Sequence, residues 1–141
     1  MEQRLSFLTL GVADFARARA FYEQGLGWKP VRVMDDVAFF QLPGFVFALY
    51  PRKLLAEDAH VEDTGGGFAG VTLAINQRDE AGVDTTLADA AKAGGKITKP
   101  AQKAFWGGYH GYFVDPDGYA WEVAYNPAIT VAPDGATIWK T

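Results

Sequence analysis

The sequence contains no cysteine, so disulfide bonds and thiolate chemistry are excluded. It has two histidines, His60 and His110, which limits any histidine-rich metal site. No block of Lys or Arg appears, and the net charge of −4 argues against a nucleic acid or an anionic membrane as a partner. The longest apolar run falls far short of the ~20 residues that span a bilayer. We therefore expect a soluble protein, with the cytoplasm as its default location.

The residues that are present are typical of a folded globular protein. Of the 141 residues, 49% are hydrophobic and 14% are aromatic, enough to form a real core. The opening stretch, MEQRLSFLTLGVADF, has a short apolar run without a small-residue cleavage site, so we interpret it as a first strand and not as a signal peptide. The chain length favours a single domain.

Two segments of the chain share one pattern. The apolar run FLTLGV (7–12) is followed by Asp14, a typical helix N-cap, and by a helix that ends near Gly25 and Gly27 and places Phe15 and Tyr22 in the core. GVTLAI (70–75) shares Thr-Leu at the same place, and an amphipathic helix ending at 93–95 follows it. Each helix precedes three strand candidates, at 31–34, 37–42 and 45–50 in one half and at KIT, YHGYFV and YAWEVAY in the other.

This repeat predicts an α+β fold in which two tandem βαβββ modules form a curved mixed sheet with helices on the outside. We expect one domain over residues 1–141, with module 1 at about 4–50 and module 2 at about 69–126. Residues 51–68 are charged and Gly-rich and begin at a proline, which predicts a linker or mobile loop. The last segment, 127–141, is expected to pack as an extension.

The matching pieces resemble the vicinal oxygen chelate superfamily, the glyoxalase/bleomycin resistance protein/dioxygenase group. They are TLGVADFARARAFYEQGLGW at the first strand and helix and FVDPDGYAWEVAYNP at the last hairpin, and the resemblance covers roughly residues 4–127. It implies a glyoxalase-like fold whose modules curl into a cleft, and a homodimer. It also implies that typical enzymes hold a divalent metal there, with ligands from several strands.

The metal positions that the resemblance implies are largely lost in this sequence. They fall on Phe7, Ala48, Gly70 and Glu122, of which Glu122 alone is a plausible ligand. A catalytic divalent ion generally needs about three protein ligands. We therefore expect no metal and no other cofactor, and we do not expect the usual Lewis-acid chemistry of the family.

Strand alternation, combined with the ligand positions that the resemblance implies, predicts the lining of the cleft. Phe113 is assigned to the core, and FWGGY (105–109) is expected at the rim. A lining that is apolar and aromatic with a few polar anchors is typical of a small-molecule pocket. The predicted ligand-binding residues are Phe7, Thr9, Ala48, Gly70, Thr72, Trp106, His110, Tyr112 and Glu122.

Three functional hypotheses follow. The first is a metal-independent protein that binds a small aromatic or cationic molecule, similar to the antibiotic-sequestering members of the family, with Glu122 meeting a cationic or hydroxyl group. The second is an enzyme: either a metal-dependent lyase, dioxygenase or isomerase with unusual ligands, or a metal-free acid–base catalyst in which Glu122 and His110 are catalytic. The third is a structural or regulatory module without a small ligand.

Overall fold

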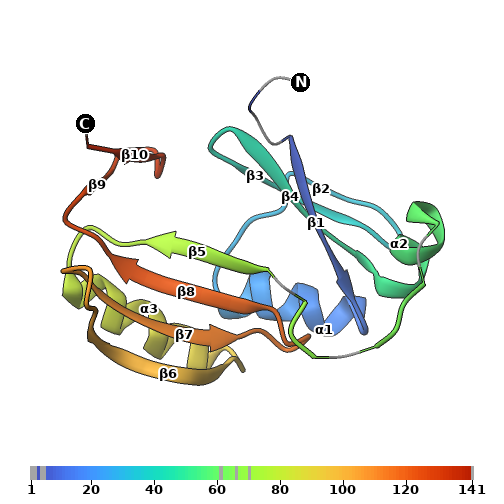
Figure 1. Cartoon of the computed structure of the whole chain (residues 1–141). Coiled ribbons are helices and arrows are strands. Elements are labelled where there is room, and N and C mark those ends of the chain that lie inside the picture. Colours follow the sequence, from blue (N-terminus) through green and yellow to red (C-terminus); the bar gives the residue numbers. More distant parts are fainter. Residues whose placement is uncertain (1–2, 4–5, 61, 66, 70, 141) are drawn as a thin grey trace. The chain divides into compact units, whose positions relative to one another are not determined.

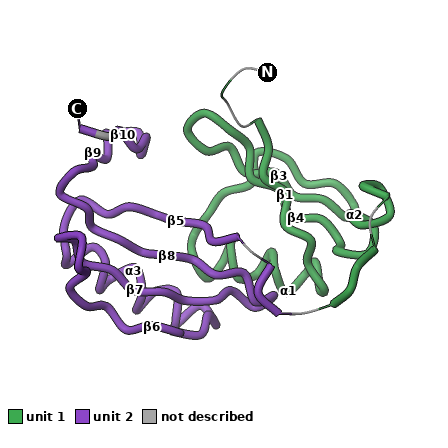
Figure 2. Tube along the Cα trace, viewed as in Figure 1, with its two compact units in different colours: residues 1–65 green, residues 66–141 purple. Residues whose placement is uncertain are grey.

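The chain folds into two compact units, Met1–Gly65 and Gly66–Thr141, which Figure 2 colours green and purple. The computed structural model describes residues 3, 6–60, 62–65, 67–69 and 71–140. Each unit contains one four-stranded mixed sheet with a helix after its first strand (Figure 1). The predicted α+β fold of two βαβββ modules is therefore confirmed.

The first unit is a sheet of strand order β1-β4-β3-β2. Strands β1 and β4 run parallel, and the other neighbouring pairs are antiparallel. The helix begins where the sequence predicts, because Asp14 Oδ1 accepts a hydrogen bond of 2.9 Å from the backbone N–H of Arg17. The elements are β1 (Phe7–Val12), α1 (Phe15–Arg19), the π-helix η1 (Ala20–Gly25), β2 (Arg32–Val33), β3 (Ala38–Leu42), β4 (Phe45–Pro51) and α2 (Arg52–Ala59).

An aromatic cluster forms the core of the first unit. The rings of Tyr22 and Trp28 lie 5.1 and 5.4 Å from the ring of Phe47, and Phe40 completes the cluster. Tyr22, Phe40 and Phe47 are almost fully buried, so the prediction for Tyr22 is confirmed. Phe15 was expected in the core but is only half-buried, because its ring lies beneath the guanidinium of Arg19 at the protein surface.

The predicted first helix changes its winding partway. It begins as an α-helix and continues as η1, in which each turn holds an extra residue. A π-helix shifts the side chains that follow it relative to the regular period of 3.6 residues, and the apolar pattern used for the prediction assumes that period.

The second unit is a sheet of strand order β5-β8-β7-β6 that packs against α3. Asp79 caps α3 by accepting a hydrogen bond of 2.7 Å from the backbone N–H of Gly82. Two short antiparallel strands form a small sheet in the predicted extension. The elements are β5 (Thr72–Asn76), α3 (Glu80–Lys92), β6 (Lys96–Lys103), β7 (Tyr109–Val114), β8 (Ala120–Tyr125), β9 (Ile129–Val131) and β10 (Thr137–Trp139).

The core of the second unit lies between α3 and one face of its sheet. Val83 and Leu87 of α3 are buried, as are Phe113 of β7 and Trp121 of β8, whose rings stack at 6.1 Å. The assignment of Phe113 to the core is correct. Strand β6 extends well past the predicted KIT segment and includes Pro100, which it accommodates because it is an edge strand.

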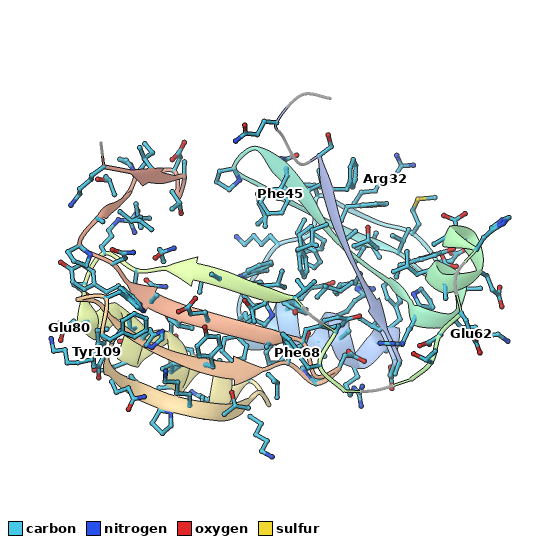
Figure 3. All side chains as sticks on the ribbon, viewed as in Figure 1. Arg32, Phe45, Glu62, Phe68, Glu80 and Tyr109 are labelled. Atoms are coloured by element: carbon cyan, nitrogen blue, oxygen red, sulfur yellow. The ribbon has the colours of Figure 1, made fainter. Side chains whose placement is uncertain are left out.

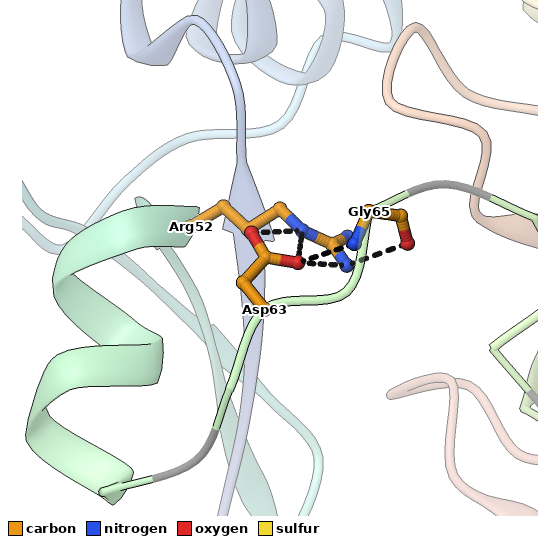
Figure 4. A network of polar contacts seen from close by, with 3 residues as sticks. All are labelled: Arg52, Asp63 and Gly65. Carbon is orange, nitrogen blue, oxygen red and sulfur yellow. Dashed lines mark hydrogen bonds and ion pairs between the residues drawn. The ribbon is translucent and has the colours of Figure 1, made fainter.

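The prediction of a loop over 51–68 is wrong for its first half, which forms α2. The sequence RKLLAEDA consists mostly of good helix formers, and Lys53 and Glu57 are spaced as an i, i+4 pair. The helix contacts β1 and β4. Beyond it, Asp63 accepts hydrogen bonds from the Arg52 guanidinium (2.8 Å from Nε) and from the backbone N–H of Gly65 at 3.1 Å (Figure 4).

None of the helices in the described parts of the chain is long and apolar enough to cross a membrane.

Candidate functional site

The candidate site lies on the face of the second sheet that points away from α3. Strands β7 and β8 pair so that Tyr112 lies opposite Glu122 and His110 lies opposite Ala124. Directly paired residues share a face, and alternate residues along a strand do so as well. His110, Tyr112 and Glu122 therefore share one face, whereas Phe113 is buried on the α3 side. The alternation in the sequence predicts this division.

His110 and Glu122 form a short hydrogen-bonded pair, with 2.6 Å between Nδ1 and Oε1. The side chain of His110 is 11% exposed and that of Glu122 is 23% exposed, so both are partly shielded from water. An ionised carboxylate can only accept hydrogen bonds, and we therefore assign a hydrogen to Nδ1. Glu122, the carboxylate in the middle of the otherwise apolar strand β8, is thus the hydrogen-bond partner of His110.

Tyr112 contributes the third polar group of this face. Burial of the phenol, the negative charge of Glu122 and a hydrogen bond to that carboxylate, in this order, raise the pKa of Tyr112 above its ordinary value. The phenol therefore stays protonated and can donate a hydrogen bond.

A tight turn places Glu122 in register with β7. The Asp115 carboxylate is buried and accepts hydrogen bonds of 2.9 Å from the backbone N–H groups of Asp117 and Tyr119. Gly118 has a φ of 87°, in the left-handed region that favours glycine. This is the DPDG turn that the sequence indicates.

The loop between β6 and β7 brings Trp106 onto His110. The two rings meet edge to face, with centroids 5.3 Å apart. The indole occupies the space beside Gly108, where an added Cβ would lie 1.8 Å from a Trp106 ring carbon and 2.4 Å from the backbone oxygen of Tyr125. Trp106 remains 36% exposed, so part of its ring is available for a ligand, whereas Phe105 points fully into solvent.

Tyr109 was expected at the rim with residues 105–108 but belongs to the opposite face. Its hydroxyl donates a hydrogen bond of 2.8 Å to Asp84 Oδ1 of α3, and neighbouring Lys103 pairs with Glu80 at the start of that helix. Figure 3 labels Glu80 and Tyr109 at this end of α3. Strand alternation explains the correction, because Tyr109 precedes His110 on β7 and must point the other way.

Lys99 is a site residue that the sequence reasoning missed. Its Nζ lies 3.0 Å from Nε2 of His110 and 5.9 Å from the centre of the Tyr112 ring. The pairing of β6 with β7 sets Lys99 opposite Tyr112 only because the register shifts by one residue, and a regular hairpin register would have set Thr98 there.

The remaining predicted ligand residues are spread over both units. Phe7, Thr9 and Ala48 share one face of the first sheet, because Thr9 is paired with Ala48 and alternation brings Phe7 to the same side. Phe7 is 54% exposed and Ala48 is buried. In the second unit Thr72 is exposed at the start of β5, and Gly70 lies outside the described residues.

The side chains present do not fit the divalent metal that the fold family implies. Among the described residues, no group of three or more His, Cys, Asp or Glu side chains is close enough to hold a metal ion. Of the positions that the resemblance implies, Phe7 and Ala48 have no side-chain ligand atom, and Glu122 is hydrogen-bonded to His110.

The comparisons with known proteins agree with this fold. The family model of the Glyoxalase/Bleomycin resistance protein/Dioxygenase superfamily matches residues 4–123, and the chain belongs to that superfamily. A glyoxalase-related enzyme from Fulvimarina pelagi is 35% identical, with a TM-score of 0.90 over 99% of this chain and 100% of that one. No curated protein matches the sequence.

More distant solved structures share the fold alone. Hypothetical protein SA1046 from S. aureus is 21% identical, with a TM-score of 0.76 over 89% of this chain and 95% of that one. A lactoylglutathione lyase from Agrobacterium tumefaciens is 20% identical, with a TM-score of 0.68 over 89% of this chain and 96% of that one.

Proposed function

We propose that this superfamily member binds a small organic molecule without a metal, on the face of the second sheet around His110. The observation that carries the proposal is the hydrogen-bonded pair of His110 and Glu122, in which the imidazole also contacts the rings of Trp106 and Tyr112. A few polar groups set among aromatic rings are typical of small-molecule sites.

The donor set supports the metal-independent part of the proposal. Glu122 is engaged by the Nδ1–H of His110, and the phenol of Tyr112 adds a hydrogen bond to the same carboxylate. A divalent ion bound to Glu122 would have to displace these partners. An organic molecule that binds through hydrogen bonds and ring contacts can do so without displacing the partners of Glu122.

Two measurements test the proposal. Elemental analysis of protein purified without chelator should find no stoichiometric Zn, Ni, Fe or Mn; a full equivalent of any of these would instead favour a metal-dependent lyase, dioxygenase or isomerase. A panel of aromatic compounds should contain ligands that raise the melting temperature. Trp106→Ala should remove that shift, while Phe105→Ala, which changes a fully exposed neighbour, should preserve it.

A second candidate function is metal-free acid–base catalysis by His110 and Glu122. The specific observation is their 2.6 Å contact, since a carboxylate that holds one imidazole nitrogen orients the other for proton transfer. The relative described as a glyoxalase-related enzyme also supports an enzyme. Turnover that persists without metal and is lost in both Glu122→Gln and His110→Ala would favour this function over binding alone.

The proposal includes a homodimer in the cytoplasm with no nucleic-acid or membrane partner. The dimer rests on the resemblance to the family, and the absence of nucleic acid rests on the net charge of −4 without a basic block. Sedimentation equilibrium should return twice the mass of the chain, and a mass of one chain would contradict the dimer.

A further inference from the structure

The strand that carries Lys99 is irregular at that residue. On β6, Ile97 lies opposite Phe113 of β7, yet the next pair joins Lys99 to Tyr112, so the register shifts by one residue. A second shift separates Lys99 from Gln102. A β-bulge redirects the side chains that follow it, because side-chain direction alternates along a strand. Without the first bulge, Thr98 would lie opposite Tyr112, and Lys99 would point to the α3 side of the sheet.

A glycine on the neighbouring strand makes room for this irregularity. A Cβ added at Gly111 would lie 2.7 Å from the backbone oxygen of Lys99 and 3.0 Å from the backbone nitrogen of Ala101. Real Cβ atoms do not approach a carbonyl oxygen so closely. The sequence of β7 therefore permits the bulge that turns Lys99 toward His110.

The hydrogen bonds of the site have a direction. An ammonium group has three donors and no acceptor, so Nζ of Lys99 donates to Nε2 of His110 across 3.0 Å. Nδ1 of the same ring then donates to Glu122. The series ends at the carboxylate of Glu122 on β8, and two N–H donors of Lys99 remain at its other end, on the edge strand β6.

We propose that Lys99 binds the carboxylate of a planar aromatic acid, whose ring lies against Trp106. This inference rests on the proposed function and reverses the expected sign of the ligand, because Glu122 already has partners whereas Lys99 keeps donors for an incoming oxyanion. Ala74, which is exposed, lies opposite Glu122 on β5, and Ala124 lies opposite His110 on β8, so the residues paired with the two polar groups have small side chains.

Three compounds that share one ring system test the charge of the ligand: naphthoate, naphthamide and naphthylmethylamine. Each is titrated into the protein by calorimetry, with the indole N–H signal of Trp106 followed by NMR. We expect naphthoate to bind most tightly and to shift that signal. Lys99→Met should weaken naphthoate binding about tenfold or more, as the loss of a charged hydrogen bond predicts.

Lys103→Met is the matched control. Lys103 also lies on β6 and also stacks on a tyrosine ring, that of Tyr109, but on the α3 side of the sheet. Its replacement removes the same net charge and should leave naphthoate affinity unchanged. An equal loss in both variants would show a general charge effect and would overturn the inference.

The remaining outcomes separate the inference from the proposed function. Tighter binding of naphthylmethylamine, or naphthoate binding that Lys99→Met does not change, overturns the role of Lys99 while the binding function stands, provided that the Trp106 signal still shifts. Failure of all three compounds to bind overturns both.

Discussion

The phenol of Tyr112 faces the carboxylate of Glu122 across the ladder of β7 and β8. The neutral form of the phenol is the one that the folded protein favours, since burial and the nearby negative charge raise its pKa above the ordinary 10.0. Because the folded protein favours the neutral phenol, Tyr112 contributes to stability through this protonation preference. By linkage, that contribution is fully present below pH 10.0 and is lost as the pH rises through the higher pKa of the folded state.

Glu122→Gln should therefore lower the pKa of Tyr112 without returning it fully to 10.0, because the charge is removed while burial, the largest cause, remains. The ultraviolet absorbance of tyrosinate, titrated with and without Tyr112→Phe to isolate this residue, measures the change. A pKa that stays constant in Glu122→Gln would show that the carboxylate does not act on the phenol.

The close packing around Gly108 leads to a steric prediction for a single residue. Gly108→Ala should displace Trp106 from His110, because the new methyl group would overlap the indole and the backbone oxygen of Tyr125. The second overlap involves main chain, so moving the indole alone does not relieve it. Overpacking of this kind costs about 1–3 kcal/mol of unfolding free energy. Chemical denaturation measures the loss, and an unchanged stability with an unchanged Trp106 fluorescence would contradict the packing described.

At the scale of the element, α2 shows how a composition rule fails. Residues 51–68 contain charges, glycines and a proline, and averaging over the whole segment concealed the eight-residue helix at its start. Pro51 lies just outside that helix, where a proline interrupts no helical hydrogen bond. The glycines all follow the helix, so the segment has two parts of opposite character.

The hydrogen bonds that Asp63 accepts from Arg52 and Gly65, after the end of α2, should depend on pH. The hydrogen bond from Arg52, followed by the backbone N–H of Gly65, lowers the pKa of Asp63 below its ordinary 3.8. A lowered pKa means that the stabilising contribution is present above pH 3.8 and is lost as the pH falls through the folded value.

Amide exchange at Gly65, corrected for its intrinsic rate, should therefore accelerate in this acid range. Asp63→Asn should remove the pH dependence, because it abolishes the charge, and protection should be low throughout. Asp58→Asn on the exposed side of α2 is the control and should behave as the original chain does. Retained protection of Gly65 in Asp63→Asn would contradict the role of the ion pair.

The candidate site was only partly predictable, and the strands explain why. The positions of His110, Tyr112 and Glu122 on one face follow from regular alternation along β7 and β8. Lys99 does not, because the first register shift on β6 reverses the side to which it points and a second shift before Gln102 reverses the side again, and a single sequence gives no reliable signal for a bulge. The Nδ1–H bond from His110 to Glu122 likewise depends on rotamers that alternation does not determine.

For the whole molecule, the repeat in the sequence was sufficient to predict the fold. The two Thr-Leu strands, each followed by a helix with an aspartate N-cap, mark the start of each unit. Asp14 and Asp79 make equivalent capping hydrogen bonds. Each unit is small, and domains of about 60 residues bury too little surface to be more than marginally stable alone. We therefore expect the chain to unfold cooperatively.

Truncating one buried ring in each unit tests this expectation. Phe47 is fully buried in the first unit and Phe113 is 2% exposed in the second. Replacing either by Ala should lower the unfolding free energy by about 3–5 kcal/mol, through lost burial and the cavity left behind. Phe105→Ala, in a residue that is 103% exposed, should change it by less than about 0.5 kcal/mol.

The number of unfolding transitions shows whether the two units unfold cooperatively. Denaturation followed by tryptophan fluorescence and by far-ultraviolet circular dichroism should give one coincident transition for the original chain, and either core substitution should shift that whole transition. Two separate transitions, of which Phe47→Ala moves one and Phe113→Ala moves the other, would instead show that each βαβββ unit is stable by itself. In that case the four-stranded sheet with its helix would be the folding unit of this chain.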